Sequence, residues 1–265
     1  MRSFFAFRGD LTSRAYSGLA VASFISLLFV WSALSYGQLV DPFFLPTPSA
    51  IGATFWRLCA QEQFLWNVWV SMSRVLIAFV LSAAIAIPLG ILMSAFKPIE
   101  ALVEPVVDFI RYLPVPALVP LTILWIGIGE SEKILLLFIG TFFQLVLMVM
   151  DDANNVPKQF FETAYTLGAP TRDVVARVLA PAIMPNVWDD LRITLGWCWT
   201  YLLIGEIVAA RTGIGHMIQE GQRFAKPDVV IVGVLTIGAI GIISDYVFKV
   251  IGHRLFPYQL RREAK

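Results

Sequence analysis

Few residues in this 265-residue chain could do chemistry, and Glu206 is the clearest candidate. It is a lone carboxylate in the apolar run WTYLLIGEIVAA. Ionisable side chains are costly in lipid, where they usually form pairs or serve a function. Glu206 could therefore line a pathway or gate, or it could pair with Arg211 or with another helix. We do not expect it to bind an anionic solute, because a carboxylate repels anions.

Four further side chains are candidates for the same pathway or gate. Gln144 lies in the apolar run TFFQLVL, where it could face the pathway or form a hydrogen bond between helices. Trp197, Trp199 and Tyr201 lie deep in the run that holds Glu206. They could line a constriction, although aromatic side chains at such positions commonly serve packing.

The sequence argues against catalysis by this chain. His216 and His253 are its only two histidines, and the G-x-S-x-G motif is absent, so we expect neither an intramembrane protease nor a metal site. No G-x-x-x-x-G-K-[ST] loop occurs, and such a loop is what cradles nucleotide phosphates. We therefore expect a non-catalytic subunit that binds no cofactor.

Composition indicates that lipid surrounds the elements that position these residues. Apolar residues make up 58% of the chain and charged residues 15%, with a mean hydropathy of +0.74. Soluble domains average about 45–50% apolar and about 25% charged residues. A net charge of +1 gives no reason to expect a nucleic-acid partner. The fold class that follows is an all-α membrane protein.

Apolar runs long enough to cross a bilayer predict about six transmembrane helices in one domain covering residues 1–265. The expected spans are 17–36, 75–95, 113–128, 134–150, 193–210 and 229–251. The first run follows three arginines, yet it is long for a signal peptide and is interpreted as an uncleaved span.

The distribution of Lys and Arg predicts that both termini and the loop 151–186 are cytoplasmic. That orientation places thirteen Lys and Arg residues inside and five outside, and Arg111 is counted inside and Lys133 outside. Arg74 and Arg192 fall near span ends, where we expect them to extend to the headgroups. The outer loop 37–67 should contain an amphipathic helix that starts at Pro48 after a Thr47 cap.

The cytoplasmic loop 151–186 predicts a helical hairpin. Phe160, Phe161, Ala164 and Leu167 fall on one helical face, followed by Gly168 where a left-handed helix terminus favours glycine. A second helix, 171–179, is expected to end near Pro181. A hairpin of this kind could lie along the membrane face and offer one side to a partner.

This loop resembles the EAA loop of bacterial ABC importer permeases. The residues that match the spaced pattern of that loop are Glu162, Thr163, Ala164, Gly168, Val178, Ala180 and Pro181. Thr163, Val178 and Ala180 depart from its usual alanine, isoleucine and leucine, but the spacing is intact. Stretches from FFLPTPSAI to GEIVAARTGIGHMI are similar to the nitrate, sulfonate and taurine group of these permeases.

The resemblance implies a type I ABC importer permease in the bacterial inner membrane. In that family the loop docks on cytoplasmic ATPase subunits, which carry ATP and Mg²⁺. Phe160 and Phe161 would be apolar anchors there, Glu162 a charged partner or a helix-stabilising residue, and Gly168 the turn. A second permease copy would complete the pathway, and a periplasmic or lipid-anchored solute-binding protein would deliver the solute.

The resemblance implies a small anion as the solute, such as nitrate, taurine or another alkanesulfonate, or bicarbonate. A pyrimidine or aromatic solute is an alternative within the same family. An ion-coupled secondary transporter is the alternative from another class. That class predicts inverted repeats and ionisable residues near the midplane, whereas we find no convincing repeat and one prominent carboxylate, Glu206.

Overall fold

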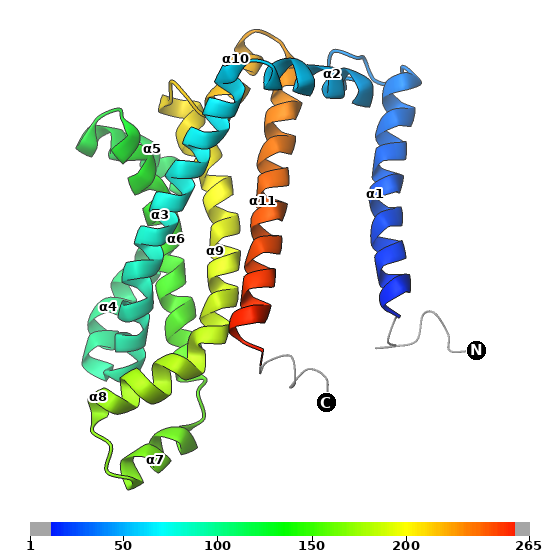
Figure 1. Cartoon of the computed structure of the whole chain (residues 1–265). Helices are drawn as coiled ribbons and strands as arrows, with labels where there is room; N and C mark the ends of the chain where they lie inside the picture. The colour runs from blue at the N-terminus through cyan, green and yellow to red at the C-terminus, as the bar shows by residue number, and fades with distance from the viewer. Residues whose placement is uncertain (1–11, 258–265) are drawn as a thin grey trace.

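The computed structural model describes residues 12–257, apart from the side chains of residues 13, 14, 62 and 209. All regular elements in this part of the chain are helical (Figure 1). They are α1 (Ser13–Tyr36), α2 (Pro48–Cys59), α3 (Glu62–Ala95), α4 (Lys97–Arg111), α5 (Val115–Ile126), α6 (Glu130–Asn154), α7 (Lys158–Thr166), α8 (Thr171–Val174), the π-helical turn η1 (Val175–Leu179), α9 (Ala180–Ala209), α10 (Ile214–Arg223) and α11 (Pro227–Leu255).

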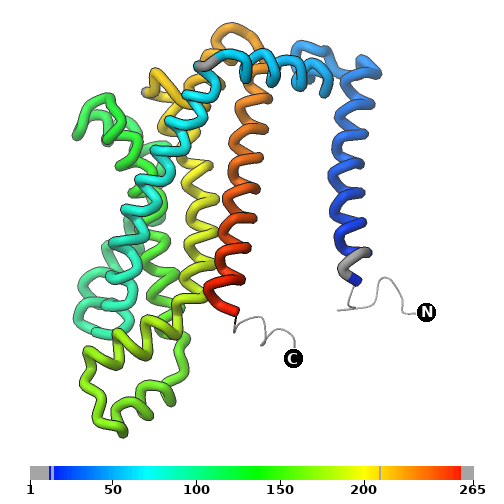
Figure 2. Tube along the Cα trace, in the orientation of Figure 1, coloured from blue at the N-terminus to red at the C-terminus, as the bar shows by residue number. Residues whose placement is uncertain are grey.

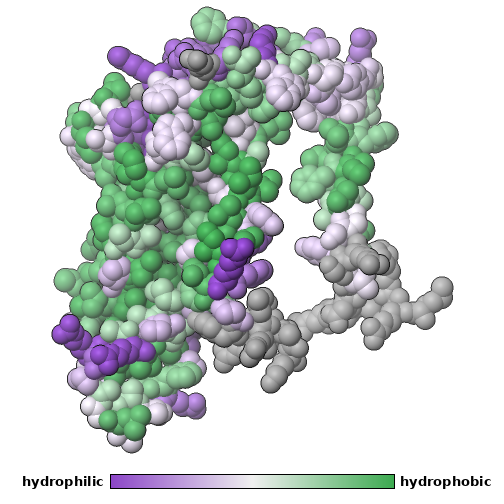
Figure 3. Space-filling model, viewed as in Figure 1, coloured by the Kyte–Doolittle hydropathy of each residue, from purple (hydrophilic) through white to green (hydrophobic). Residues whose placement is uncertain are grey.

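The helices confirm the expected all-α membrane architecture. Among the described residues five helices are long and apolar enough to cross a bilayer, and a sixth span results if α4 and α5 are counted together. Apolar side chains cover the middle of the bundle, and hydrophilic ones gather toward its two ends (Figure 3). The arginines and lysines expected inside at residues 2, 8, 261, 262 and 265 lie outside the described residues.

The third expected span differs from the structure in its shape. The segment expected as a straight helix over residues 113–128 is the second arm of a broken pair, since α4 and α5 meet at an angle of 104°. Pro114 and Pro116 stand at the start of α5, where residues that lack an N–H group can begin a helix but cannot extend the preceding one. Arg111, the last residue of α4, therefore lies at this bend.

The segment before α9, which was expected to be cytoplasmic, also differs from expectation. We expected a helix that ends near Pro181, but α8, η1 and α9 form one helical stretch, Thr171–Val208. Pro181 lies in the first turn of α9, directly after the π-helical turn Val175–Leu179. A π turn changes the i→i−4 hydrogen-bond pattern locally, so a proline that lacks its N–H can follow it without ending the helix.

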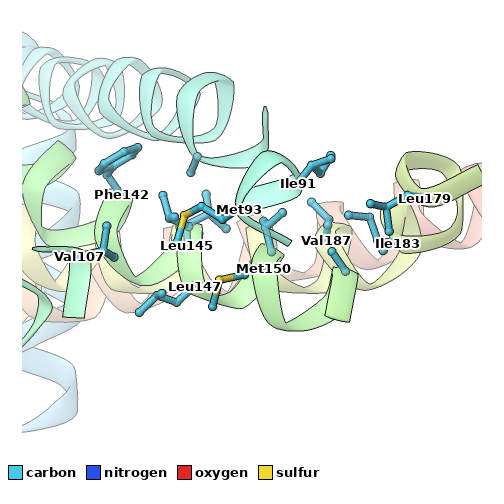
Figure 4. Packing of buried hydrophobic residues seen from close by; sticks show 14 residues of the cluster. Ile91, Met93, Val107, Phe142, Leu145, Leu147, Met150, Leu179, Ile183 and Val187 are labelled. Atoms are coloured by element: carbon cyan, nitrogen blue, oxygen red, sulfur yellow. The ribbon is translucent and has the colours of Figure 1, made fainter. Parts of the chain in front are cut away.

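Helices α3, α6 and α9 form the centre of the bundle, and the tube drawing shows them side by side (Figure 2). One large apolar cluster holds together the halves of these helices that lie nearer α7 and includes Met93, Leu145 and Ile183 (Figure 1 and Figure 4). Gly90 allows α3 to approach α6 closely, because a Cβ there would lie 2.7 Å from the carbonyl oxygen of Val146. The α3–α6 contact is therefore a rigid backbone-to-backbone contact.

Helix α1 stands apart from this bundle (Figure 1). The apolar stretch that qualifies it as a span is not buried. Its hydrogen bonds to distant residues gather at its C-terminal end, where Trp31 donates to the Pro46 carbonyl at 3.0 Å and Ser35 to the Leu45 carbonyl at 3.1 Å. Trp31 also packs against the apolar cluster that includes Ile51 and Ile214, and it is the contact of α1 with the apolar clusters of the described residues.

Candidate functional site

A buried polar network around Glu206 closes the end of the bundle near α2 and α10 (Figure 1). The Glu206 side chain is fully buried, and its carboxylate accepts hydrogen bonds from Ser71 Oγ at 2.7 Å, Arg74 Nη1 at 2.5 Å and the Gly215 N–H at 2.7 Å. These donors come from α3 and α10, whereas Glu206 belongs to α9. The carboxylate therefore links three helices.

Arg74 is the centre of this network. Its side chain is 2% exposed, and its Nε and Nη2 donate to the carboxylate of Glu130 at 2.5 and 2.6 Å. The remaining donors reach Glu206 Oε1 at 2.5 Å and the carbonyl oxygen and hydroxyl of Thr212 at 2.8 and 3.1 Å. A guanidinium bonded on all its sides tolerates burial, because its donors have partners.

Side chains of α3 also hold the loop that follows α9. Asn67 Oδ1 accepts from the Gly213 N–H at 2.9 Å, and Ser71 Oγ accepts from the Ile214 N–H at 2.9 Å. Asn67, Ser71 and Arg74 are spaced at i, i+4 and i+7, so they form one polar stripe on an apolar helix. The sequence therefore contained a signal for this network, namely the polar stripe, which our prediction did not use.

Gly213 makes this close packing possible. Its φ is +117°, and a Cβ there would overlap with Oε1 of Glu206. We expect Gly213→Ala to lower the apparent melting temperature of the purified protein, because strain adds to a displaced buried carboxylate. Gly127→Ala is the matched control: its φ is +82°, but nothing lies within 4 Å of the added Cβ. Equal destabilisation by both variants would contradict the role of the carboxylate contact.

The structure corrects one expectation about charged residues and decides between two alternatives for another. Arg74 does not extend to the headgroups, because it is buried and bonded to Glu130 and Glu206. Of the two partners open to Glu206, another helix is the one observed, and its cation is Arg74 rather than Arg211. Because Glu206 is fully enclosed, it does not face an open surface in this structure.

Lys133, expected on the outer surface, is buried together with Glu132. The Lys133 ammonium donates to the Gly129 carbonyl at 2.9 Å and lies 3.7 Å from Glu132 Oε2. Thr122 donates to the other Glu132 oxygen at 3.2 Å. The GESEK connection is therefore largely the first turn of α6, in which Glu132 and Lys133 pack inward while Glu130 and Ser131 are exposed.

The four remaining pathway candidates separate into two groups. Trp199 packs in an apolar cluster with Val75 and Leu202, as the packing interpretation expects. Trp197 is half-buried. Gln144 and Tyr201 instead line one cavity of about 370 Å³, together with Arg111. The structure thus brings two of the four together at the bend between α4 and α5.

The hairpin of α7 and α8 has the turn that the sequence predicts. Gly168 has a φ of +80°, and its N–H donates to the Tyr165 carbonyl at 2.9 Å. The Ala169 N–H donates to the Ala164 carbonyl at 3.0 Å. These two bonds define a Schellman motif that ends α7 and turns the chain toward α8.

The side chains of α7 divide between the bundle and the solvent. Phe161 packs against the large apolar cluster, whereas Phe160 is 55% and Leu167 83% exposed. The side chains of Glu162 and Thr163 are exposed, whereas that of Phe161 is half-buried. Glu162 also lines a cavity of about 550 Å³ between α7 and the ends of α3 and α6. In Figure 1 the hairpin projects beyond the bundle, at the end opposite to α2 and α10.

Comparison with known proteins places this geometry in a family. The model of the family described as "Binding-protein-dependent transport system inner membrane component" matches residues 86–257. The chain belongs to this family. The chain is therefore a membrane permease component of a binding-protein-dependent transport system.

Curated relatives of this permease cover most of its length. It is 29% identical to the taurine transport system permease protein TauC of Escherichia coli over 91% of this chain and 89% of that protein. It is 28% identical to the putative aliphatic sulfonates transport permease protein SsuC of Bacillus subtilis over 88% of this chain and 84% of that protein. A probable ABC transporter permease of Brucella abortus is 33% identical over 82% and 87%.

Solved structures of ABC transporters share the fold of this permease. A chain of the MetNI methionine transporter aligns with a TM-score of 0.60 at 21% identity, over 72% of this chain and 99% of that one. A chain of a bacterial alginate transporter aligns with a TM-score of 0.66 at 13% identity, over 93% and 98%. The architecture expected for a type I importer permease is thereby confirmed.

Proposed function

We propose that this permease is the membrane subunit of an ATP-driven importer for small sulfonates of the taurine and alkanesulfonate class. The observation that supports the ATP-driven mechanism is the hairpin of α7 and α8, at which the apolar side chains of Phe160 and Leu167 are exposed. The taurine and aliphatic sulfonate relatives support the solute class. Hydrolysis of ATP, with its Mg²⁺, is assigned to a separate subunit, since this chain has no phosphate-binding loop.

The division of side chains on α7 refines the proposed docking contact. Phe160 and Leu167 are exposed and would enter a groove on the ATPase, as large apolar residues often anchor such contacts. Phe161 points inward and holds α7 against the bundle. Phe161 and the Gly168 turn attach α7 firmly to the bundle. A displacement of α7 would therefore also displace α6 and α8.

The remaining partners follow from the same proposal. Two copies of this chain would form the pathway around a two-fold axis, the commonest closed symmetry. The termini and the hairpin would be cytoplasmic, and the chain would reside in a bacterial inner membrane. The outer face, formed by α2 and α10, would then receive the loaded binding protein.

Reconstitution tests this function directly. Proteoliposomes with the permease, its ATPase and its binding protein should accumulate labelled taurine or ethanesulfonate only when ATP is present on the side that the ATPase faces. Labelled nitrate, bicarbonate and formylaminopyrimidine serve as competing solutes, the last because one relative is a formylaminopyrimidine transport permease. Uptake driven by a proton or sodium gradient without ATP would instead support a secondary transporter.

Charge reversal at Glu162 tests the docking face. We expect Glu162→Lys to weaken ATPase binding and to change its dependence on salt, because charges at the rim of an interface act mainly on association. Asp173→Lys is the control: it reverses a charge of the same sign on α8, where Asp173 faces Arg177 at 3.9 Å. An equal loss of ATPase co-purification in both variants would remove the specific role of Glu162.

A further inference from the structure

We propose that the cavity at the α4–α5 bend binds the oxyanion group of a small solute. The inference rests on the proposed function, because it places a solute subsite in the permease itself. The cavity measures about 370 Å³ and is lined by α4, α5, α6, α9 and the segment that joins α4 to α5. That volume suits a small organic anion and is at the lower end of the range for ligand pockets, about 300–1,000 Å³.

The cavity lies beside the α4–α5 bend, about halfway along α6. Gly140 and Gln144, which line it, are near the centre of α6 (Glu130–Asn154). The backbone between α4 and α5 is broken at this depth, with an angle of 104° between the two helices. Non-helical backbone at membrane depth is tolerated where it is buried in protein or lines a cavity, and transporters commonly place solute sites beside broken helices.

Three side chains offer hydrogen-bond donors to this cavity. The Gln144 amide and the Tyr201 hydroxyl have no protein partner among the described residues. Arg111 Nη2 forms an ion pair with Asp108 Oδ1 at 2.9 Å and donates a hydrogen bond to the Tyr112 hydroxyl at 3.2 Å. Within residues 12–257 the Nε and Nη1 groups of Arg111 have no hydrogen-bond partner. Polar groups left unpaired in a membrane protein cost free energy, so a ligand or water that bonds to them is favoured.

The charge and shape of the lining indicate the ligand class. Arg111 is the one charged residue among the described residues that line the cavity, since Asp108 lies outside the lining. The Nε and Nη1 groups of Arg111 can each donate one charge-assisted hydrogen bond to an oxyanion, while Nη2, which both bidentate edges of the guanidinium share, contacts Asp108 and Tyr112. Leu113, Val115 and Leu118 form an apolar wall, which suits the methylene groups of an alkanesulfonate.

Gly140 sets the position of the Tyr201 ring. A Cβ on Gly140 would lie 2.7 Å from Tyr201 Cδ2, so the ring lies directly over the glycine backbone. This contact brings a residue of α9 to the cavity that α4, α5 and α6 otherwise enclose. The cavity is therefore assembled from four helices, and the bend in the broken span is one of its walls.

Direct binding to the permease–ATPase complex in nanodiscs, without the binding protein, tests the proposal. Calorimetry would use ethanesulfonate, nitrate and acetate as probes, with ethylammonium and ethanol as cationic and neutral controls. We expect oxyanion binding that Gln144→Leu and Tyr201→Phe each weaken by about 10- to 100-fold, as the loss of a hydrogen bond to a charged group predicts. Thr200→Val, which removes a hydroxyl beside Tyr201 but outside the lining, should bind like the original chain.

Two outcomes would overturn the cavity proposal. One is that none of the three oxyanions binds to the original complex, and the other is that Gln144→Leu and Tyr201→Phe bind as tightly as Thr200→Val. Failure of the proposed function looks different: the complete system would not take up taurine or ethanesulfonate. The nitrate and acetate probes still decide the cavity proposal in that case.

Discussion

Replacing Gly168 with valine should abolish ATP-dependent transport while leaving the chain in the membrane. Gly168 has a φ of +80°, and a β-branched residue in this conformation costs about 1–2 kcal/mol or more. That strain corresponds to roughly a 5- to 30-fold loss of the turn that presents α7. Uptake and co-purification of the ATPase should therefore both fall sharply.

Gly168→Asn is the matched control for this experiment. Asparagine tolerates the left-handed conformation, and nothing lies within 4 Å of the Cβ that it adds. We expect this variant to retain most of its transport and its ATPase. A valine variant that binds the ATPase and transports normally would show that α7 is not the docking element.

Arg74→Ala should destabilise the permease more than Gly213→Ala or any of the other single substitutions. It leaves Glu206 fully buried without its cation, and breaking a buried ion pair costs about 3–5 kcal/mol. We expect a much lower apparent melting temperature in detergent and a smaller yield of monodisperse protein. The double variant Arg74→Met, Glu206→Met should recover much of this loss, because it leaves neither member of this pair buried alone.

Arg57→Ala provides the comparison for an exposed ion pair. Arg57 lies 3.3 Å from Asp228, and its side chain is 60% exposed. Exposed pairs contribute about 0–1 kcal/mol, so this variant should melt close to the original chain. If Arg74→Ala were no less stable than Arg57→Ala, Arg74 and Glu206 would not hold the outer end together.

Local features of the structure could be predicted from the sequence. The left-handed Gly168 is one, because a helix terminus depends on a few neighbouring residues. The start of α2 is another: Thr47 accepts from the Ala50 N–H at 3.3 Å, and Pro48 is the first residue of the helix. The apolar spans follow from composition in the same way. Their number was therefore predictable to within about one span.

Long-range pairing could not be predicted. Arg74 and Glu206 are 132 residues apart, so only the fold shows that they meet. A straight helix and a bent pair contain similar apolar runs, and the 104° bend therefore left no signal in hydropathy. Pro181 normally ends a helix, and the sequence did not show that a π turn would accommodate it. Gln144 and Tyr201 line one cavity beside the α4–α5 bend, so their proximity could not be predicted without that bend.

The uninterrupted helix Thr171–Val208 joins the two ends of this molecule mechanically. At 1.5 Å per residue its 38 residues follow a path of about 57 Å, well beyond the thickness of the hydrocarbon layer at about 30 Å. The turn after α7 enters one end, and Glu206 lies close to the other. If the hairpin docks as proposed, a push on it would travel along helical backbone toward the Arg74–Glu206 pair without crossing a loop.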